Sequence, residues 1–231
     1  RPPRALLAVG HGEGAHLAAQ LPGRLPGLTH VALISGGPSG ALEEWMALAS
    51  TLPQAGSKSG LNPQLRALAL AAAQMRAEPR STDKTLFGQP YRYWAARLGA
   101  SQIDALAARP LRVFIAHGER DRSVPVASSD RLAAELLARG ADLTWLRLPG
   151  ADHALIAPGA TGGAALRDML GTVLAWQAGT APLGDAVVWP IPGGAEVIDM
   201  GKLSLERIQA EAEAERLRRL NSPGTNNPGG F

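Results

Sequence analysis

Two polar residues in the second half of the chain have the types and spacing of an acid–base pair. Asp121 follows an apolar run that ends at His117, and His153 follows another apolar run that ends at Leu148. A histidine that is oriented by a carboxylate can take a proton from a nucleophile and return it to a leaving group. The pair therefore indicates nucleophilic catalysis, if a nucleophile stands nearby.

The position at which a nucleophile is expected holds a glycine. Residues 7–15, LAVGHGEGA, run from an apolar stretch through a glycine-rich turn into a helix-like segment. This is the layout of a G-x-S-x-G turn, in which a strained strand-to-helix connection presents a serine hydroxyl. Gly10 and Gly14 occupy the two glycine positions, and Gly12 stands where the serine would be. Covalent acyl transfer through position 12 is therefore impossible, because glycine has no side chain.

Four short apolar runs are predicted as the strands that hold these segments. Their nearly continuous apolar character is typical of strands that are covered on both faces of a parallel sheet. The predicted strands are Ala5–Val9, His30–Ser35, Leu111–His117 and Asp142–Leu148. Helical patterns accompany them at Glu13–Leu21, Leu65–Ala77, Ser128–Arg139 and Ala164–Gln177. The alternation predicts an α/β fold with a doubly wound, mainly parallel sheet.

One long interval interrupts this alternation. Residues 37–109 contain no convincing strand and show short helical stretches separated by proline and glycine. An excursion of this length between two core strands is predicted to be an inserted helical cap. The core would then comprise residues 1–36 and 110–179, and residues 180–231 would form a C-terminal extension with a helix at 205–220 and a flexible tail.

The composition is that of an ordinary soluble, folded protein. Of 231 residues, 45% are hydrophobic and 19% are charged, and the net charge is +3, which argues against global disorder and against nucleic-acid binding. There is no cysteine, so disulfides and thiolate chemistry are excluded. No apolar run reaches the length of a membrane span, and no signal peptide is visible, so the compartment stays open. The five histidines form no H-E-x-x-H or His-x-His pair, so neither a metal nor a cofactor is expected.

Together, the three segments resemble those of the α/β-hydrolases, a superfamily of serine esterases, lipases and peptidases. The motifs are VGHGEGA at 9–15, H-G-x-x-D-x-x-V-P at 117–125 and L-P-G-A-D-H at 148–153. They follow the chain order of nucleophile, acid and histidine that this family uses. The segment YRYWAARL resembles the last cap helix of lidded members. The resemblance covers about residues 4–178.

The resemblance implies a role for each matching residue. His153 corresponds to the general base, and Asp121 to the carboxylate that orients it. Gly12 corresponds to the nucleophile, and the backbone N–H of Glu13 to one donor of the oxyanion hole. A parent with serine at position 12 would hydrolyse carboxylic esters, thioesters or amides through an acyl-enzyme. With glycine there, the resemblance implies an inactive or strongly impaired protein.

Several neighbouring side chains have more than one interpretation. His11 is expected to pack beneath the turn, with a catalytic role as the weaker alternative, and it is also a candidate to line the substrate pocket. Glu119 and Asp152 flank the acid and the histidine, and they fit the motif less well as the orienting carboxylate. In the predicted cap, four aromatic side chains either pack internally or line an apolar pocket for substrate. They are Trp45, Tyr91, Tyr93 and Trp94.

A non-catalytic function fits the same residues. A structural or assembly subunit can use the hydrolase fold as a scaffold, and ligand binding without turnover lies between scaffold and enzyme. Because the first predicted strand begins at Ala5 and the family normally has further strands upstream, we expect an upstream segment or a protein partner to cover that sheet edge. Gly12 also fits an ordinary tight turn, in which glycine is the usual residue. If a serine was lost there, the loss is either natural or introduced. The retained Asp121 and His153 favour a recent or introduced loss.

Overall fold

The computed structural model describes most of the first 190 residues. The described residues are 5–37, 40–51, 62–99, 102–160, 162–181 and 187–189, and positions 210, 213, 214 and 217 near the C-terminus. The chain divides into two compact units, residues 1–190 and 191–231. The predicted helix at 205–220 lies outside the described residues, apart from those four positions, which are helical.

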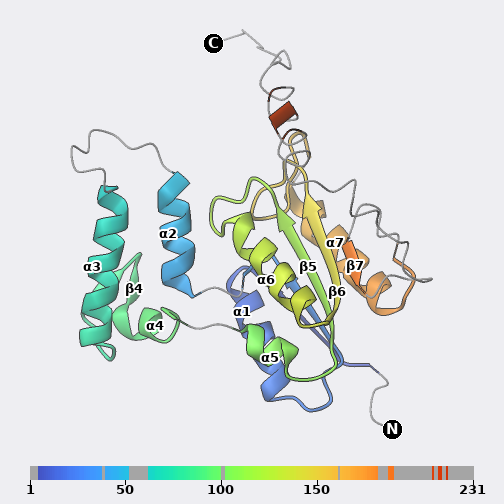
Figure 1. Cartoon of the computed structure of the whole chain (residues 1–231), viewed down its shortest axis with the longest axis horizontal. Helices are drawn as coiled ribbons and strands as arrows, with labels where there is room; N and C mark the ends of the chain where they lie inside the picture. Colours follow the sequence, from blue (N-terminus) through green and yellow to red (C-terminus); the bar gives the residue numbers. More distant parts are fainter. Residues whose placement is uncertain are drawn as a thin grey trace. The chain divides into compact units, whose positions relative to one another are not determined.

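A five-stranded sheet in the order β1-β2-β5-β6-β7 forms the centre of the first unit (Figure 1). The strands are β1 (Leu7–His11), β2 (His30–Ile34), β5 (Arg112–Gly118), β6 (Asp142–Leu148) and β7 (Val187–Trp189). The first four run parallel, and β7 pairs antiparallel with β6. The predicted α/β fold with a mainly parallel sheet is confirmed.

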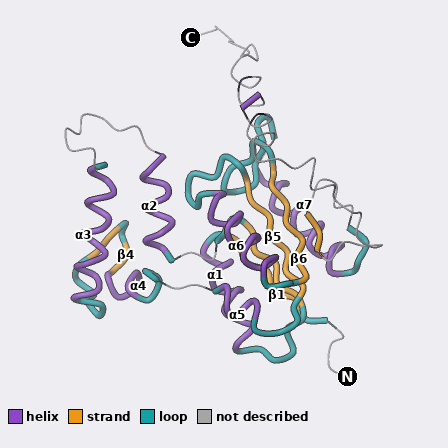
Figure 2. The backbone as a smooth tube through the Cα atoms, in the orientation of Figure 1, coloured by secondary structure: helices purple, strands orange, loops and turns teal. Residues whose placement is uncertain are grey.

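Helices cover both faces of this sheet (Figure 2). One face packs against α1 (Glu13–Gln20), α5 (Ile103–Ala107) and α6 (Val126–Ala138), and the other against α7 (Gly162–Gln177). Every residue of β2 is buried, which explains why its sequence is apolar on both faces. The short helix η1 (Leu21–Gly23) follows α1.

The interval after β2 forms a helical subregion. It contains α2 (Ala41–Thr51), α3 (Pro63–Ala77), the small hairpin of β3 (Thr85–Leu86) and β4 (Gln89–Pro90), and α4 (Tyr91–Ala95). A cluster of Ala72, Met75, Tyr91 and Leu98 forms its own small core. The start of α3 follows from its sequence: Pro63 needs no N–H partner, and the side chain of Asn62 accepts a hydrogen bond from the backbone N–H of Gln64 (2.8 Å).

Two features of this interval differ from the sequence-based expectation. The hairpin of β3 and β4 adds two short strands, because Phe87 and Gly88 both adopt positive φ, as a two-residue hairpin turn requires. Helix α5 lies within the interval predicted as cap, but Ile103 and Leu106 pack in the same core cluster as α1 and α6. Three-residue spacing puts these two side chains on one helix face, which the core covers.

A buried carboxylate joins this subregion to the sheet's helices. Glu44 of α2 lies with its Oε1 atom 3.5 Å from Nε2 of His16 in α1, and it accepts a hydrogen bond from the hydroxyl of Ser128 in α6 (3.4 Å). All three side chains are buried.

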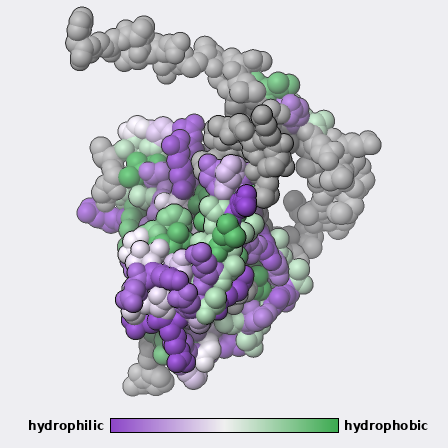
Figure 3. All heavy atoms as spheres, turned by 90° about the vertical axis from the view of Figure 1, so that its left-hand side faces the viewer, coloured by the Kyte–Doolittle hydropathy of each residue, from purple (hydrophilic) through white to green (hydrophobic). Residues whose placement is uncertain are grey.

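On the face of the molecule drawn in Figure 3, hydrophobic and hydrophilic residues are interspersed.

Candidate active site

The glycine-rich turn between β1 and α1 has the geometry of a strained strand-to-helix connection. Gly12 adopts a φ of 54° and a ψ of −119°, and its backbone N–H donates to the carbonyl of Ile34 (2.8 Å). A Cβ atom on Gly10 would stand 2.1 Å from the carbonyl oxygen of Gly14, so this position accepts only glycine. The turn therefore holds residue 12 at the carboxyl end of β1, in a conformation that side chains rarely adopt.

Asp121 and His153 are joined by a direct hydrogen bond. The Nδ1–H group of His153 donates to Oδ2 of Asp121 over 2.7 Å, although 32 residues separate them in sequence. The register of strands β5 and β6 explains why the two side chains come together. The strands are parallel, Arg112 pairs with Asp142 and Gly118 with Leu148, so both strands end at the same edge of the sheet. The carboxylate fixes the histidine tautomer, which leaves the lone pair of Nε2 free to act as a base.

The carboxylate of Asp121 is fully buried and has four hydrogen-bond donors. The backbone N–H groups of Ser123 and Val124 donate to Oδ1 (2.7 and 2.9 Å), and Nε2 of His117 lies 3.0 Å from Oδ2, which also accepts from His153. Burial alone would raise the pKa of Asp121. The hydrogen bonds from His117, His153 and the two backbone groups outweigh burial and hold this pKa well below its usual range.

The hydrogen bond to Asp121 raises the pKa of His153 above 6.5, and burial of the imidazole only partly opposes it. The charge of Asp121 and that of Asp152 act in the same direction as the hydrogen bond. A stronger base accepts a proton from a nucleophile more readily, provided that the pH lies above its pKa.

Nε2 of His153 faces the position where a nucleophile would stand. A Cβ atom on Gly12 would lie 3.0 Å from this nitrogen and 3.3 Å from the neighbouring Cε1. Glu13 is the first residue of α1, so the helix leaves its backbone N–H unused and available to an oxyanion. The structure thus brings Gly12, Glu13, Asp121 and His153 together.

His11 lies beside the hydrogen-bonded pair of Asp121 and His153. Its Nε2–H donates to the backbone carbonyl of His153 (2.8 Å), and the two rings are 4.8 Å apart. This contact links the elbow turn directly to the histidine loop. It indicates that His11 positions His153.

The two alternative carboxylates have other partners. Asp152 accepts hydrogen bonds from the backbone N–H groups of Ala154 and Ile156 (2.9 Å each), which stabilises the histidine loop. Glu119 forms an ion pair with Arg147 (3.4 Å). Asp121 is the carboxylate bonded to His153.

The sequence did not predict two of the contacts made near the site. His117 belongs to the H-G-x-x-D motif, and its four-residue spacing from Asp121 was the available signal. Tyr93 of α4 donates its hydroxyl to the carboxylate of Glu13, and Arg97 lies 3.2 Å from the same carboxylate. Burial and the hydrogen bond to Glu13 raise the pKa of Tyr93.

Three of the four aromatic pocket candidates of the predicted cap, Trp45, Tyr91 and Trp94, lie in the small core of that subregion. Tyr91 is buried, and its hydroxyl donates to the side chain of Gln74 (3.0 Å). The indole N–H of Trp94 donates to the backbone carbonyl of Leu86 (2.7 Å). Tyr93 is the aromatic residue of α4 that reaches the elbow.

A glycine keeps the acid loop and the histidine loop in close contact. A Cβ atom on Gly118 would stand 2.3 Å from the carbonyl oxygen of Asp152 and 2.5 Å from that of Ala151. We predict that Gly118→Ala lowers the free energy of unfolding by about 1–3 kcal/mol, because backbone must move to admit the methyl group. Urea denaturation measures this loss.

A matched control for this variant lies in α7. Gly171 has no atom within 4 Å of its Cβ position, and its helical site favours alanine by about 0.5–1 kcal/mol. Gly171→Ala should therefore stabilise the protein. If Gly118→Ala proves as stable as Gly171→Ala, the close contact of the two loops is wrong.

Within the described part of the chain, no group of three histidine, cysteine, aspartate or glutamate residues is arranged to hold a metal ion. No helix in the same part is both long enough and apolar enough to cross a membrane.

Several solved structures are similar to this chain at low sequence identity. A puromycin-hydrolyzing peptidase of Mycobacterium tuberculosis is 16% identical, with a TM-score of 0.44, over 78% of this chain and 22% of that one. Est1E from Butyrivibrio proteoclasticus is 14% identical, with a TM-score of 0.45, over 74% and 60%. The esterase domain of a Rhodothermus marinus protein is 16% identical, with a TM-score of 0.42, over 73% and 60%. The chain thus spans less than two thirds of each.

Of the two sequence comparisons, one gives a match. No curated protein matches this chain. A family model of the prolyl oligopeptidase family matches residues 77–178, which include the acid loop and the histidine loop. This match covers less than half of the chain. Together with the mainly parallel sheet and the order of the three loops, it supports an α/β-hydrolase fold.

Proposed function

We propose that this protein contains a serine-hydrolase-type active site that lacks only its nucleophile. It would bind a carboxylic ester, thioester or amide at the carboxyl edge of the sheet without forming an acyl-enzyme. The observation that carries the proposal is the 3.0 Å separation between Nε2 of His153 and the Cβ position of Gly12. A base oriented by a buried carboxylate points at the place from which a serine would attack.

The residues present support one slow reaction with water as nucleophile. His153 takes a proton from water at Nε2 while the water oxygen bonds to the substrate carbonyl carbon. The backbone N–H of Glu13 donates to the resulting oxyanion, and His153 then returns the proton to the departing alcohol, thiol or amine. Loss of the nucleophile costs about a million-fold in kcat in a well-studied triad, so turnover should be very slow.

The pH dependence of this residual reaction tests the proposal. Only neutral His153 acts as a base, and its pKa lies above 6.5. The rate of p-nitrophenyl acetate hydrolysis, after subtraction of the buffer rate, should therefore be lowest in acid and rise to a plateau with a midpoint above 6.5.

His153→Ala is the control for this profile. It should remove the rise and leave the rate at the buffer level. A profile that is flat in the native sequence, or that keeps its shape in His153→Ala, would exclude His153 as the base.

A scaffold role is the second candidate, and one observation favours it. Strand β1 is the outer strand of the described sheet, and apolar side chains on it and on α1 are exposed: Val9 at 40% and Leu17 at 61%. An upstream segment or a protein partner could cover this edge. A stoichiometric complex in which the β1 amides are protected from hydrogen exchange, combined with an inert Gly12→Ser variant, would favour the scaffold over the enzyme.

A further inference from the structure

A cavity of about 740 Å³ lies at the opposite end of the sheet from Gly12 and His153. It is lined by residues at the start of β2, by the connection from α5 to β5 and by the connection from α6 to β6. Strand β5 runs from Arg112 at the cavity to Gly118 beside the catalytic pair. Seven residues of strand span about 20 Å, so the cavity is separate from the candidate active site.

The cavity has an apolar wall. Leu106 of α5, Pro110 and Leu111 before β5, and Ala141 before β6 contribute to it. Its volume lies in the range of pockets that hold small organic molecules.

Three arginines also line the cavity, and one has uncharged partners. The guanidinium of Arg109 donates to the backbone carbonyls of Leu25, Pro26 and Leu28. These carbonyls fix its position without neutralising its charge. Arg109 therefore contributes a positive potential that is built into the fold.

Arg112 forms an ion pair that is partly exposed to water. Its Nε lies 3.4 Å from Oδ2 of Asp142, and both side chains are about two-fifths exposed. Its guanidinium also lies over the ring of Trp176, 5.1 Å from the ring centre, and 3.5 Å from Nε2 of His30. Burial, and then the charge of Arg112, lower the pKa of His30, which favours the neutral form of this imidazole.

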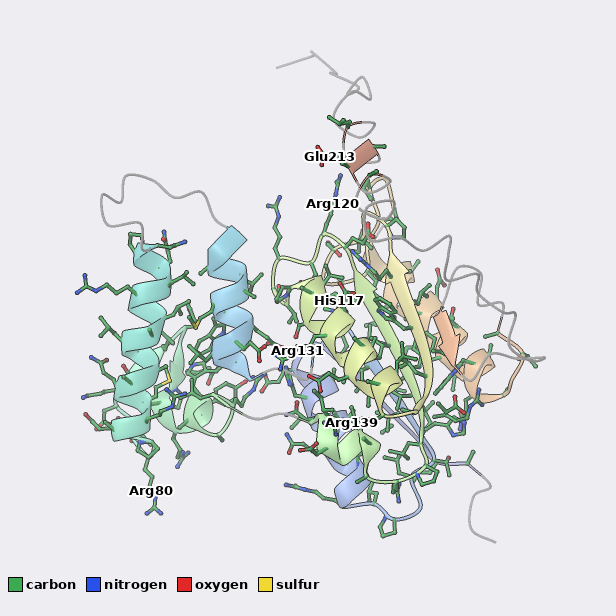
Figure 4. All side chains as sticks on the ribbon, viewed as in Figure 1. Arg80, His117, Arg120, Arg131, Arg139 and Glu213 are labelled. Atoms are coloured by element: carbon green, nitrogen blue, oxygen red, sulfur yellow. The ribbon has the colours of Figure 1, made fainter. Side chains whose placement is uncertain are left out.

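Arg139 has an exchangeable partner. Its Nη1 lies 2.7 Å from Oδ1 of Asp104, whose side chain is 88% exposed, and its Nη2 lies 3.8 Å from Glu135. Exposed ion pairs of this kind contribute little to stability, so a ligand anion can replace Asp104. Figure 4 shows Arg139 at the end of α6 next to α5, whereas His117 lies toward the other end of the sheet.

We propose that this cavity binds a small organic anion, a carboxylate attached to an apolar chain. Arg112 and Arg139 would hold the carboxylate, Arg109 would add its potential, and the wall around Leu106 and Leu111 would cover the chain. A guanidinium suits a carboxylate because it donates two parallel hydrogen bonds. A ligand of this site needs both a carboxylate charge and an apolar hydrocarbon chain. The proposal is independent of the proposed hydrolase function.

Calorimetric titration with octanoate tests this proposal. Octan-1-ol has the chain without the charge, and acetate has the charge without the chain, so both should bind at least about tenfold more weakly than octanoate. Arg112→Gln and Arg139→Gln should each weaken octanoate binding about tenfold, which corresponds to loss of one charge-assisted contact.

Two control variants locate the site. Arg66→Gln removes one positive charge from the exposed surface of α3, and His153→Ala alters the candidate active site; neither should change octanoate binding. Equal binding of octanol or acetate would overturn the proposal. So would unchanged affinity in both Arg112→Gln and Arg139→Gln, or loss of binding in His153→Ala, which would place octanoate at the hydrolase site.

Discussion

Gly12→Ser is expected to raise the rate of p-nitrophenyl acetate hydrolysis by more than about four orders of magnitude, and by up to about a million-fold. A serine there would have its Cβ 3.0 Å from Nε2 of His153, so its hydroxyl could donate to the base and attack the ester carbonyl. The reaction would then pass through an acyl-enzyme, with a burst of p-nitrophenol at high enzyme concentration. Stopped-flow absorbance measures both the burst and the later steady rate.

The serine has a conformational cost that a matched variant isolates. The φ of 54° at residue 12 and the tight approach to His153 should lower the free energy of unfolding by about 1–3 kcal/mol. Gly12→Ala carries the same backbone strain and the same Cβ contact without a hydroxyl. If Gly12→Ser is folded but no more active than Gly12→Ala, the hydrolase heritage is architectural only.

Asp121→Asn in the Gly12→Ser background should lower kcat by about four orders of magnitude. An asparagine side chain donates as well as accepts, so the tautomer with a proton on Nε2 becomes stable and His153 no longer faces the serine as a base. The hydrogen bond that raises the pKa of His153 also loses its charge. Histidine NMR titration should show this pKa falling, so the rate and the titration report the same contact.

Asp152→Asn is the control for this effect. Asp152 lies next to His153 in sequence, and its oxygen caps the backbone N–H groups of Ala154 and Ile156. An asparagine oxygen can accept the same two bonds, so kcat should change little. Comparable losses in Asp121→Asn and Asp152→Asn would contradict the assignment of Asp121 as the orienting carboxylate.

The fold could be predicted because each core strand is apolar nearly throughout. The boundaries were less accessible: β1 runs from Leu7 to His11, whereas the apolar run ends at Val9. Gly10 and His11 pair with β2 through their backbones, and backbone pairing does not depend on side-chain polarity. The pattern therefore could not show where pairing ends.

The contact between Asp121 and His153 could also be predicted from sequence, since the ends of parallel strands meet at one edge of a sheet. The surrounding contacts could not. Asp121 reaches His117, four residues earlier, because the loop after β5 folds back onto the end of that strand. Tyr93 rather than Tyr91 reaches Glu13, because side chains two residues apart on a helix point in different directions. A five-residue helix such as α4 has too little periodicity to show which side faces the core.

The most direct test of the central claim is intact-mass spectrometry after treatment with a fluorophosphonate. This reagent bonds to a serine hydroxyl that an adjacent base activates. We predict one adduct on Gly12→Ser and none on the native sequence or on Gly12→Ser combined with His153→Ala. An unlabelled Gly12→Ser protein that is folded, or equal labelling with and without His153, would contradict the account of a hydrolase site that lacks only its nucleophile.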